Sequence, residues 1–217
     1  MVCGGSVMEH SDLAVDLPLS AIAEAFEELA KKVNERKNEQ QHIRLDIFCE
    51  TASLVSILFR CLGLAFKFAE MEYVAKLHGL VEASKTCQTL QEIIDLDVAN
   101  DTVKTSGSSS RNLRRVQQGL DLVRAIFEQL LSTDDISLKG VASTAYGEVC
   151  APYHTWTVRT AVYAGMYTLP TRDQLFFKLN ETEQSAEKKM RRYISASLPV
   201  IEYIDKLYLS RNIVLNW

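Results

Sequence analysis

The segment from about Ile43 to Ser84 constrains the fold more than any other, because it is the most apolar part of the chain. Its polar residues recur at helical steps and form one narrow stripe: Ser53, Ser56, Arg60, Lys67 and Glu70. A cation at the centre of this segment, Arg60, would be costly inside a bilayer, which argues against a membrane span. The pattern predicts a central core helix with a narrow solvent-facing stripe, broken or bent around Gly63.

The rest of the chain also follows helical spacing, and no stretch alternates convincingly with a period of two. Helices are predicted over about 19–33, 89–99, 111–131, 141–150, 158–166, 175–179 and 182–209, with a kink at Pro199 in the last. Thr171 is expected to cap the short helix that follows it. The expected fold is a single all-α domain of about eight helices over residues 18–217, with a loose tail at residues 1–17. The apolar segment Ile213–Trp217 is expected to dock on this domain.

Composition excludes several classes of function. A formal charge of −4 argues against an extended nucleic-acid surface. Five cysteines without a C-x-x-C pair indicate a reducing compartment and predict neither a zinc site nor a disulfide framework. No apolar signal segment opens the sequence, so we expect a cytosolic protein. The chain contains no phosphate-binding P-loop, no dinucleotide-binding motif, no nucleophile elbow and no zinc-protease motif. We therefore expect a protein that is not an enzyme and that binds no cofactor or metal.

The stretch Ser106–Arg115 places three arginines at the start of a predicted helix. Cations are unfavourable at this end of a helix, whereas free backbone N–H groups and guanidinium groups together suit a bound phosphate. Arg111 and Arg115 share a face that continues into apolar residues, while Arg114 is expected on the polar side. The residues alone leave a second interpretation open, in which this is a solvated basic turn.

Glu72 and Lys76 lie four residues apart within the apolar segment. On a helix this spacing puts both side chains on one face, where an exposed pair of this kind is a common surface feature. The spacing alone therefore assigns them no function.

Several collinear stretches between residues 19 and 217 together resemble the glycolipid-transfer-protein family, and most closely its plant branch that transfers ceramide-1-phosphate. The stretches are Ala52–Val55, Leu62–Met71, Tyr73–Lys76, Arg111–Leu113, Arg115–Val116, Gly119–Asp121, Ala151–Pro152 with His154 and Trp156, and Gly165–Arg172. The resemblance implies a two-layer helical sandwich in which a polar head-group centre opens onto a hydrocarbon tunnel.

The resemblance also implies roles for individual residues. Lys76, Arg111 and Arg115 match the family's phosphate-binding cations, where the sugar-binding branch has an asparagine in place of Lys76 and a tryptophan in place of Arg115. His154 matches the histidine that binds the sphingolipid amide carbonyl. Glu72 stands where the family has an aspartate that accepts the amide N–H. Glu72 would either accept a hydrogen bond from the lipid amide N–H or neutralise the charge of Lys76 when no lipid is bound.

The implied membrane contact is Trp156, which matches a tryptophan beside the tunnel mouth. The resemblance thus implies non-enzymatic transfer or sensing of ceramide-1-phosphate by a monomer that touches membranes transiently. A second hypothesis is an all-α interaction scaffold, lipid-regulated or lipid-independent, that binds a signalling partner. Nucleic-acid binding is disfavoured by the net charge and by the lack of aromatic residues among the arginines.

Overall fold

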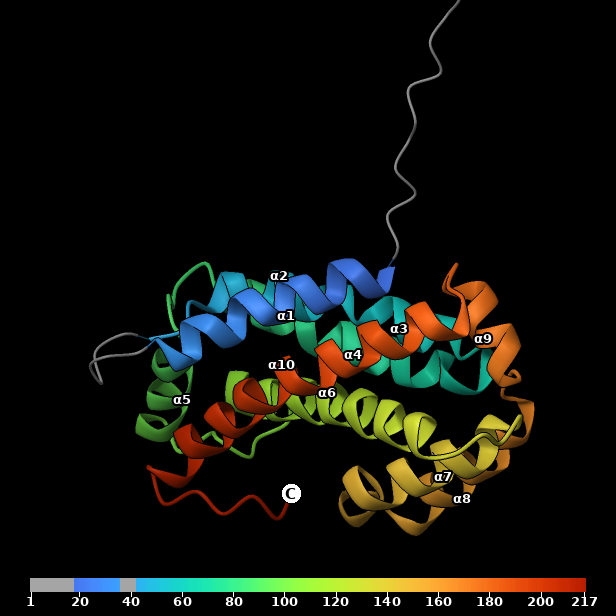
Figure 1. Cartoon of the computed structure of the whole chain (residues 1–217). Coiled ribbons are helices and arrows are strands. Elements are labelled where there is room, and N and C mark those ends of the chain that lie inside the picture. Colours follow the sequence, from blue (N-terminus) through green and yellow to red (C-terminus); the bar gives the residue numbers. More distant parts are fainter. Residues whose placement is uncertain (1–17, 36–41) are drawn as a thin grey trace, which may run out of the picture.

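The computed structural model describes residues 18–35 and 42–217, so the expected tail at residues 1–17 lies outside the described residues. Within these ranges the chain forms ten α-helices and two short 3₁₀-helices (Figure 1). They are α1 (Pro18–Asn34), α2 (Leu45–Leu54), α3 (Ser56–Cys61), α4 (Leu64–Ala83), α5 (Leu90–Ala99), α6 (Ser109–Ser132), α7 (Leu138–Val149), η1 (Ala151–Tyr153), α8 (Trp156–Gly165), η2 (Met166–Thr168), α9 (Arg172–Lys178) and α10 (Glu183–Leu209).

The apolar segment, predicted as a core helix broken or bent around Gly63, forms three helices, which accounts for ten helices instead of about eight. The break at Gly63 is confirmed: its φ of 84° lies in the left-handed region, which glycine adopts without strain. The break at Val55 was not predicted. There the backbone tightens into i→i+3 hydrogen bonds, with the Leu58 N–H donating to the Val55 carbonyl at 3.0 Å.

Helix α4 exposes apolar side chains, so the expected narrow polar stripe on an otherwise buried helix is wrong for this part of the segment. Tyr73 and Leu77 are buried, but Leu64, Phe68 and Met71 are exposed. The elements that contact α4 (α2, α3, α6, α8 and η2) leave these three side chains uncovered. Its apolar composition therefore reflects two different surfaces, one packed in the core and one facing outward.

Helix α6 lies in the middle of the fold, with α1 and α2 on one side and α7 and α8 on the other (Figure 1). Helices α4, α7 and α10 all pack directly on it, and α10 in turn packs along α1. Tyr193 of α10 packs in the core between α1 and α6. Its ring lies 5.0 Å from that of Phe26 and 5.6 Å from that of Phe127, and its hydroxyl donates to the Leu120 carbonyl at 3.0 Å.

The last part of the chain behaves largely as the sequence predicts. Thr171 caps α9 through a full capping box with Gln174. Helix α10 continues as one helix through Pro199, and the kink expected there stays a prediction. The segment after α10 docks on the domain: the Trp217 ring packs edge-on against that of Tyr208 at 6.0 Å. None of the helices in the described ranges combines the length and the apolar character that crossing a bilayer requires.

Candidate functional site

The first turn of α6 already has internal partners for two of its backbone N–H groups. Ser108 caps the helix, its hydroxyl accepting from the Arg111 N–H at 3.2 Å. The carboxylate of buried Asp97 accepts from the Ser110 N–H at 2.6 Å and brings negative charge to this helix end. The expectation that free N–H groups help to hold an anion here is therefore wrong for these two groups. An anion bound nearby would be held chiefly by side chains.

Arg111 and Arg115 are two half-buried cations on one face of α6. Arg111 Nη1 donates to the Lys104 carbonyl at 2.5 Å, and Arg115 Nη1 donates to Gln118 Oε1 at 2.7 Å. Both acceptors are neutral, and neither arginine forms an ion pair within the described part of the chain. Burial and the charges of Arg111 and Arg114 lower the pKa of the Arg115 guanidinium. Two neighbouring cations without a counter-charge suit a dianionic ligand.

Lys76 of α4 lies at the same height along α6 as Arg111 and Arg115. A Cβ atom added at Gly119 of α6 would lie 2.6 Å from the Tyr73 ring, and one added at Gly79 would meet the side chain of Asn112. These two close approaches show that α4 and α6 run antiparallel, with Tyr73 opposite Gly119 and Gly79 opposite Asn112. Lys76 lies midway between the two contacts and is thus level with the second turn of α6.

Glu72 lies one helical turn before Lys76, and its Oε2 is 3.5 Å from the Lys76 ammonium. Both side chains are partly exposed, so the pair contributes only a few tenths of a kcal/mol. In the lipid-free protein Glu72 thus supplies Lys76 with a weak counter-charge. Its role as an acceptor for a lipid amide stays a prediction.

His154 follows η1 and lies close enough to Arg115 to interact with its charge. Its Nδ1 lies 2.8 Å from the Tyr146 hydroxyl. Burial raises the pKa of Tyr146 to about 12, so the phenol keeps its proton. Donation of that proton to Nδ1 leaves the imidazole Nε2–H as a hydrogen-bond donor. Burial, and next the charge of Arg115, lower the pKa of His154 and favour this neutral form.

Replacing Arg115 with leucine is expected to raise the pKa of His154 toward its ordinary value of about 6.5. The change removes one of the two causes of the lowered pKa and leaves burial in place. Because the folded-state pKa is lowered, His154 subtracts stability as the pH falls below about 6.5, and this loss is smaller in the variant. An NMR titration of the imidazole measures the effect. An unchanged pKa would show that Arg115 does not act on His154.

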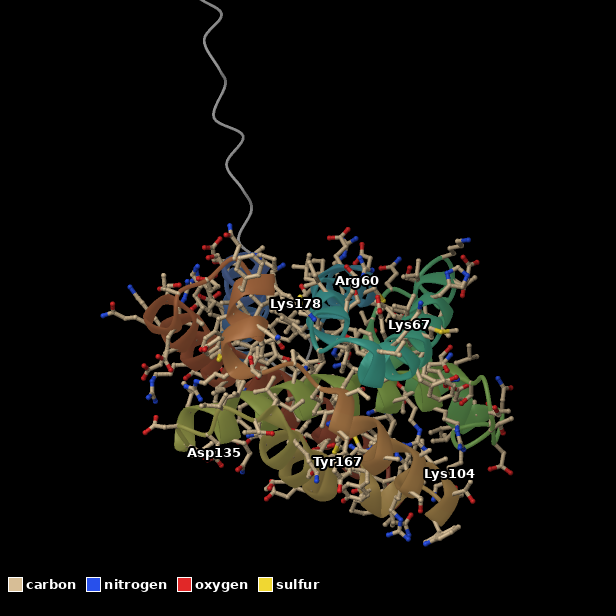
Figure 2. The ribbon with its side chains drawn as sticks, turned by 90° about the vertical axis from the view of Figure 1, so that its right-hand side faces the viewer. Arg60, Lys67, Lys104, Asp135, Tyr167 and Lys178 are labelled. Atoms are coloured by element: carbon tan, nitrogen blue, oxygen red, sulfur yellow. The ribbon has the colours of Figure 1, made fainter. Side chains whose placement is uncertain are left out.

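Trp156 stands apart from the cations. It is the first residue of α8 and is 73% exposed. Helix α8 has no buried residue, and both α8 and η2 contact α4. Exposed apolar and aromatic side chains of these three elements form what we term the apolar rim: Leu64, Phe68, Met71, Trp156, Tyr163 and Tyr167. Lys67 and Tyr167 lie on the same face of the molecule (Figure 2).

The rim is linked to His154 through Tyr146, by one aromatic contact and one hydrogen bond. The Tyr163 ring packs edge-on against the Tyr146 ring at 5.4 Å, and Tyr146 holds His154. The structure thus brings Arg111, Arg115, Lys76, Glu72 and His154 into one region and sets Trp156 beside it on the outside.

Arg114 corrects one expectation from the sequence. It was expected on the polar side of α6, but its side chain is buried, with the whole residue 7% exposed. Its guanidinium pairs with Asp205 of α10 at 2.9 Å and lies 5.6 Å from the Tyr153 ring. Gln117 is buried beside it and donates to the same carboxylate at 2.7 Å. The polar side of this turn is covered because α10 supplies charged and carbonyl partners there, which the sequence of α6 alone does not reveal.

The face that carries Arg111 and Arg115 leads into the apolar interior. A small closed cavity lies between α3, α6 and α9, and its lining is entirely apolar: Leu58, Leu62, Val123, Ile126, Phe127, Leu175 and Leu179. A hydrocarbon chain could be received here only if these helices or side chains moved apart.

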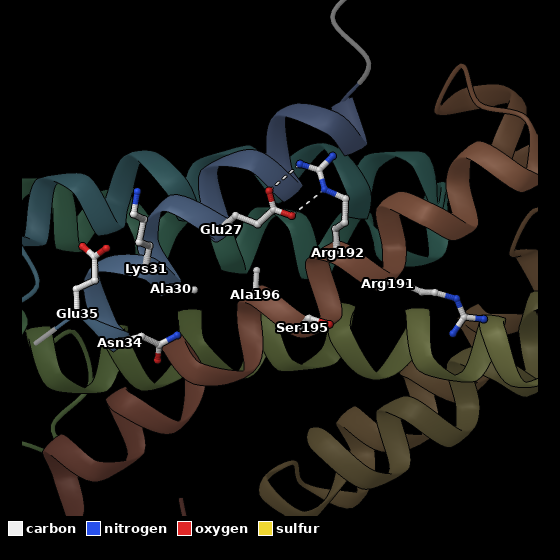
Figure 3. Close-up of a pocket in the computed structure, with 9 residues that line it drawn as sticks. All are labelled: Glu27, Ala30, Lys31, Asn34, Glu35, Arg191, Arg192, Ser195 and Ala196. Carbon is white, nitrogen blue, oxygen red and sulfur yellow. Dashed lines mark hydrogen bonds and ion pairs between the residues drawn. The ribbon is translucent and has the colours of Figure 1, made fainter.

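A surface hollow of about 590 Å³ lies elsewhere, between α1 and α10 (Figure 3). Five of its nine lining residues are charged. Two of them, Glu27 and Arg192, form a two-pronged ion pair with both contacts at 2.7 Å. None of the cluster residues lines this hollow.

Comparison with known proteins connects this arrangement to a family. Residues 43–181 match the glycolipid transfer protein (GLTP) family. The chain is 66% identical over 206 residues to the ACD11 homolog protein of Arabidopsis thaliana, covering 94% of this chain and 90% of that protein. It is 45% identical over 208 residues to accelerated cell death 11 (ACD11) of the same plant, covering 95% and 100%.

A solved structure agrees with the fold. The crystal structure of an Arabidopsis ACD11 mutant complexed with ceramide-1-phosphate matches this chain with a TM-score of 0.89 at 45% identity, covering 94% of this chain and 100% of that one. The all-α fold implied by the resemblance is thereby confirmed. The chain belongs to the glycolipid transfer protein family.

Proposed function

We propose that this protein binds ceramide-1-phosphate and carries it between membranes without changing it chemically. The observation that carries the proposal is the pair of half-buried arginines, Arg111 and Arg115, which have no counter-charge within the described residues. Support comes from ACD11, which has the same fold and is crystallised with ceramide-1-phosphate. The site would act by binding alone, in the cytosol and at membrane surfaces.

The phosphate is held by Arg111 and Arg115, with Lys76 assisting from α4. A phosphomonoester carries a charge of about −1.5 to −2 at neutral pH, which two or three cations can balance. The His154 Nε2–H donates to the amide carbonyl, and Glu72 accepts from the amide N–H. Phosphate and amide are thus recognised by residues of different helices.

Glu72 changes partners in this proposal. Its weak, partly exposed contact with Lys76 breaks when the phosphate arrives, because the dianion is the stronger counter-charge. The freed carboxylate then turns to the amide N–H. A glutamate is one methylene longer than the aspartate of the family, so the helix or the rotamer must compensate for the extra reach.

The hydrocarbon chains enter the apolar interior beneath the cations. Each methylene that leaves the bilayer loses about 0.8 kcal/mol unless an equally dry environment receives it. The closed cavity beside Ile126 is therefore expected to open as the chains enter. Its apolar lining would close again after release, which keeps the empty protein free of water-exposed core.

The proposed substrate is tested by transfer between vesicles of three lipids. Ceramide-1-phosphate is expected to move fastest, because it alone offers both the phosphate and the amide. Glucosylceramide lacks the phosphate and should move at least about tenfold more slowly, since a charge-assisted contact contributes about 1.5–3 kcal/mol. Phosphatidic acid lacks the amide and should rank between them. Transfer of none of the three would favour the interaction scaffold instead.

The apolar rim is proposed to be the surface that touches the bilayer. Indole and phenol rings are stable at the boundary between hydrocarbon and water, and Lys67, on the same face as Tyr167, would face anionic head groups (Figure 2). The variants Trp156→Ala and Phe68→Ser should each weaken binding to empty anionic vesicles by about tenfold, measured by vesicle sedimentation. Their affinity for a dispersed short-chain ceramide-1-phosphate should stay unchanged. Loss of lipid affinity without loss of vesicle binding would contradict this placement of the rim.

A further inference from the structure

Gln118 lies at the inner edge of the cation cluster, which consists of Arg111, Arg115 and Lys76. It lies on α6 one turn after Arg115 and is only 7% exposed. The face on which it lies runs from Arg111 and Arg115 through Gln118 to Leu122 and Ile126. The polarity of this face falls along the helix, from cations through a neutral amide to hydrocarbon.

The orientation of the Gln118 amide is fixed by its neighbour. Arg115 Nη1 lies 2.7 Å from Gln118 Oε1, and a guanidinium can only donate. The amide oxygen must therefore face Arg115, and the amide NH₂ must point away from it. A flipped amide would put two donors against each other.

The Gln118 NH₂ is buried and has no acceptor among the described residues. Buried polar groups nearly always have a hydrogen-bond partner, because an unpaired one forfeits its hydration without compensation. An unpaired donor beside a cluster of binding residues therefore indicates a ligand acceptor that the empty protein does not supply.

We infer that Gln118 is a specificity-determining residue whose NH₂ donates to the hydroxyl oxygen of the sphingoid base. The inference rests on the proposed function. The phosphate is assigned to the cations, the amide carbonyl to His154 and the amide N–H to Glu72, which leaves the hydroxyl as the unassigned polar group of ceramide-1-phosphate. The order phosphate, hydroxyl, chain in the lipid follows the order of cations, Gln118 and apolar residues along α6.

The test compares short-chain ceramide-1-phosphate with its analogue lacking that hydroxyl, by titration calorimetry. The wild-type protein should prefer the hydroxylated lipid by about tenfold, the value of one net hydrogen bond. In Gln118→Met and Gln118→Leu this preference should fall to about one. Weaker phosphate binding caused by release of Arg115 affects both lipids equally and cancels in the ratio. The control Gln129→Met, on a distant turn of α6, should keep the tenfold ratio.

A ratio near ten in both Gln118 variants would overturn the inference while leaving the proposed function standing. Failure of the wild-type protein to bind either lipid would instead overturn the proposed function. A wild-type ratio near one would also overturn the inference, because the hydroxyl would then make no net contribution.

Discussion

Arg115→Leu is expected to abolish vesicle-to-vesicle transfer of ceramide-1-phosphate while the protein stays folded. Removing one member of a partly buried charge pair costs about 2–5 kcal/mol, which lowers lipid affinity by at least about 30-fold. The fold should survive because Arg115 makes its one side-chain hydrogen bond to Gln118 and forms no ion pair within the described residues. Leucine also relieves the repulsion between Arg115 and its neighbours Arg111 and Arg114. Loss of the donor to the buried Gln118 amide oxygen opposes this gain, so the unfolding temperature of the variant should stay close to that of the wild type.

The matched control for this prediction is Arg191→Leu. Arg191 is an exposed cation of α10 beside the hollow between α1 and α10, and among the described residues it pairs only with Glu187 one turn away. Transfer by this variant should match that of the wild type. Equal transfer by Arg115→Leu and the wild type would remove Arg115 from the binding site, whatever the effect on stability.

Val123→Phe is expected to reduce the affinity for long-chain ceramide-1-phosphate by about 100-fold or more. Val123 lines the closed cavity, which is smaller than a phenylalanine ring. The ring would take the space that opens when the chains enter, and overpacking should cost the fold about 1–3 kcal/mol. If the added ring displaces about four methylenes of the lipid chain, the loss is about 3 kcal/mol. A short-chain ceramide-1-phosphate, which reaches only the head-group residues, should bind with unchanged affinity. Titration with both lipids measures the difference.

Val123→Ala is the control in the opposite direction. It enlarges the same cavity and should lower the stability of the fold by about 1–3 kcal/mol while leaving long-chain binding intact. If Val123→Phe binds the long-chain lipid as well as the wild type does, the chains must take another route through the interior.

Periodicity predicted the helical class and most helix positions because most of the helices bury one stripe of apolar residues; α8, which buries none, is an exception. The Gly63 break could be predicted, since glycine alone favours a φ of 84°. The Val55 break could not, because a β-branched residue is compatible with a helix and the tightening there depends on how α2 and α3 pack. The outward-facing residues of α4, such as Phe68 at 71% exposed, were assigned to the core since an apolar residue carries no mark of which surface it faces.

In the candidate site, too, local sequence patterns could be recognised, whereas contacts between distant parts of the chain could not. Local pattern identified the arginine cluster, and the resemblance added Lys76, Glu72 and His154 from elsewhere in the chain. Arg114 was misplaced because its partner Asp205 lies on α10, 91 positions away in the sequence. The contribution of Asp97 to the start of α6 was missed for the same reason.

A crystal structure of the protein with ceramide-1-phosphate bound would test the central claim most directly. The account predicts phosphate oxygens within hydrogen-bond distance of the guanidinium groups of both Arg111 and Arg115, with the chains leading past Ile126. A phosphate that contacts neither arginine, for example one bound in the hollow between α1 and α10, would contradict it.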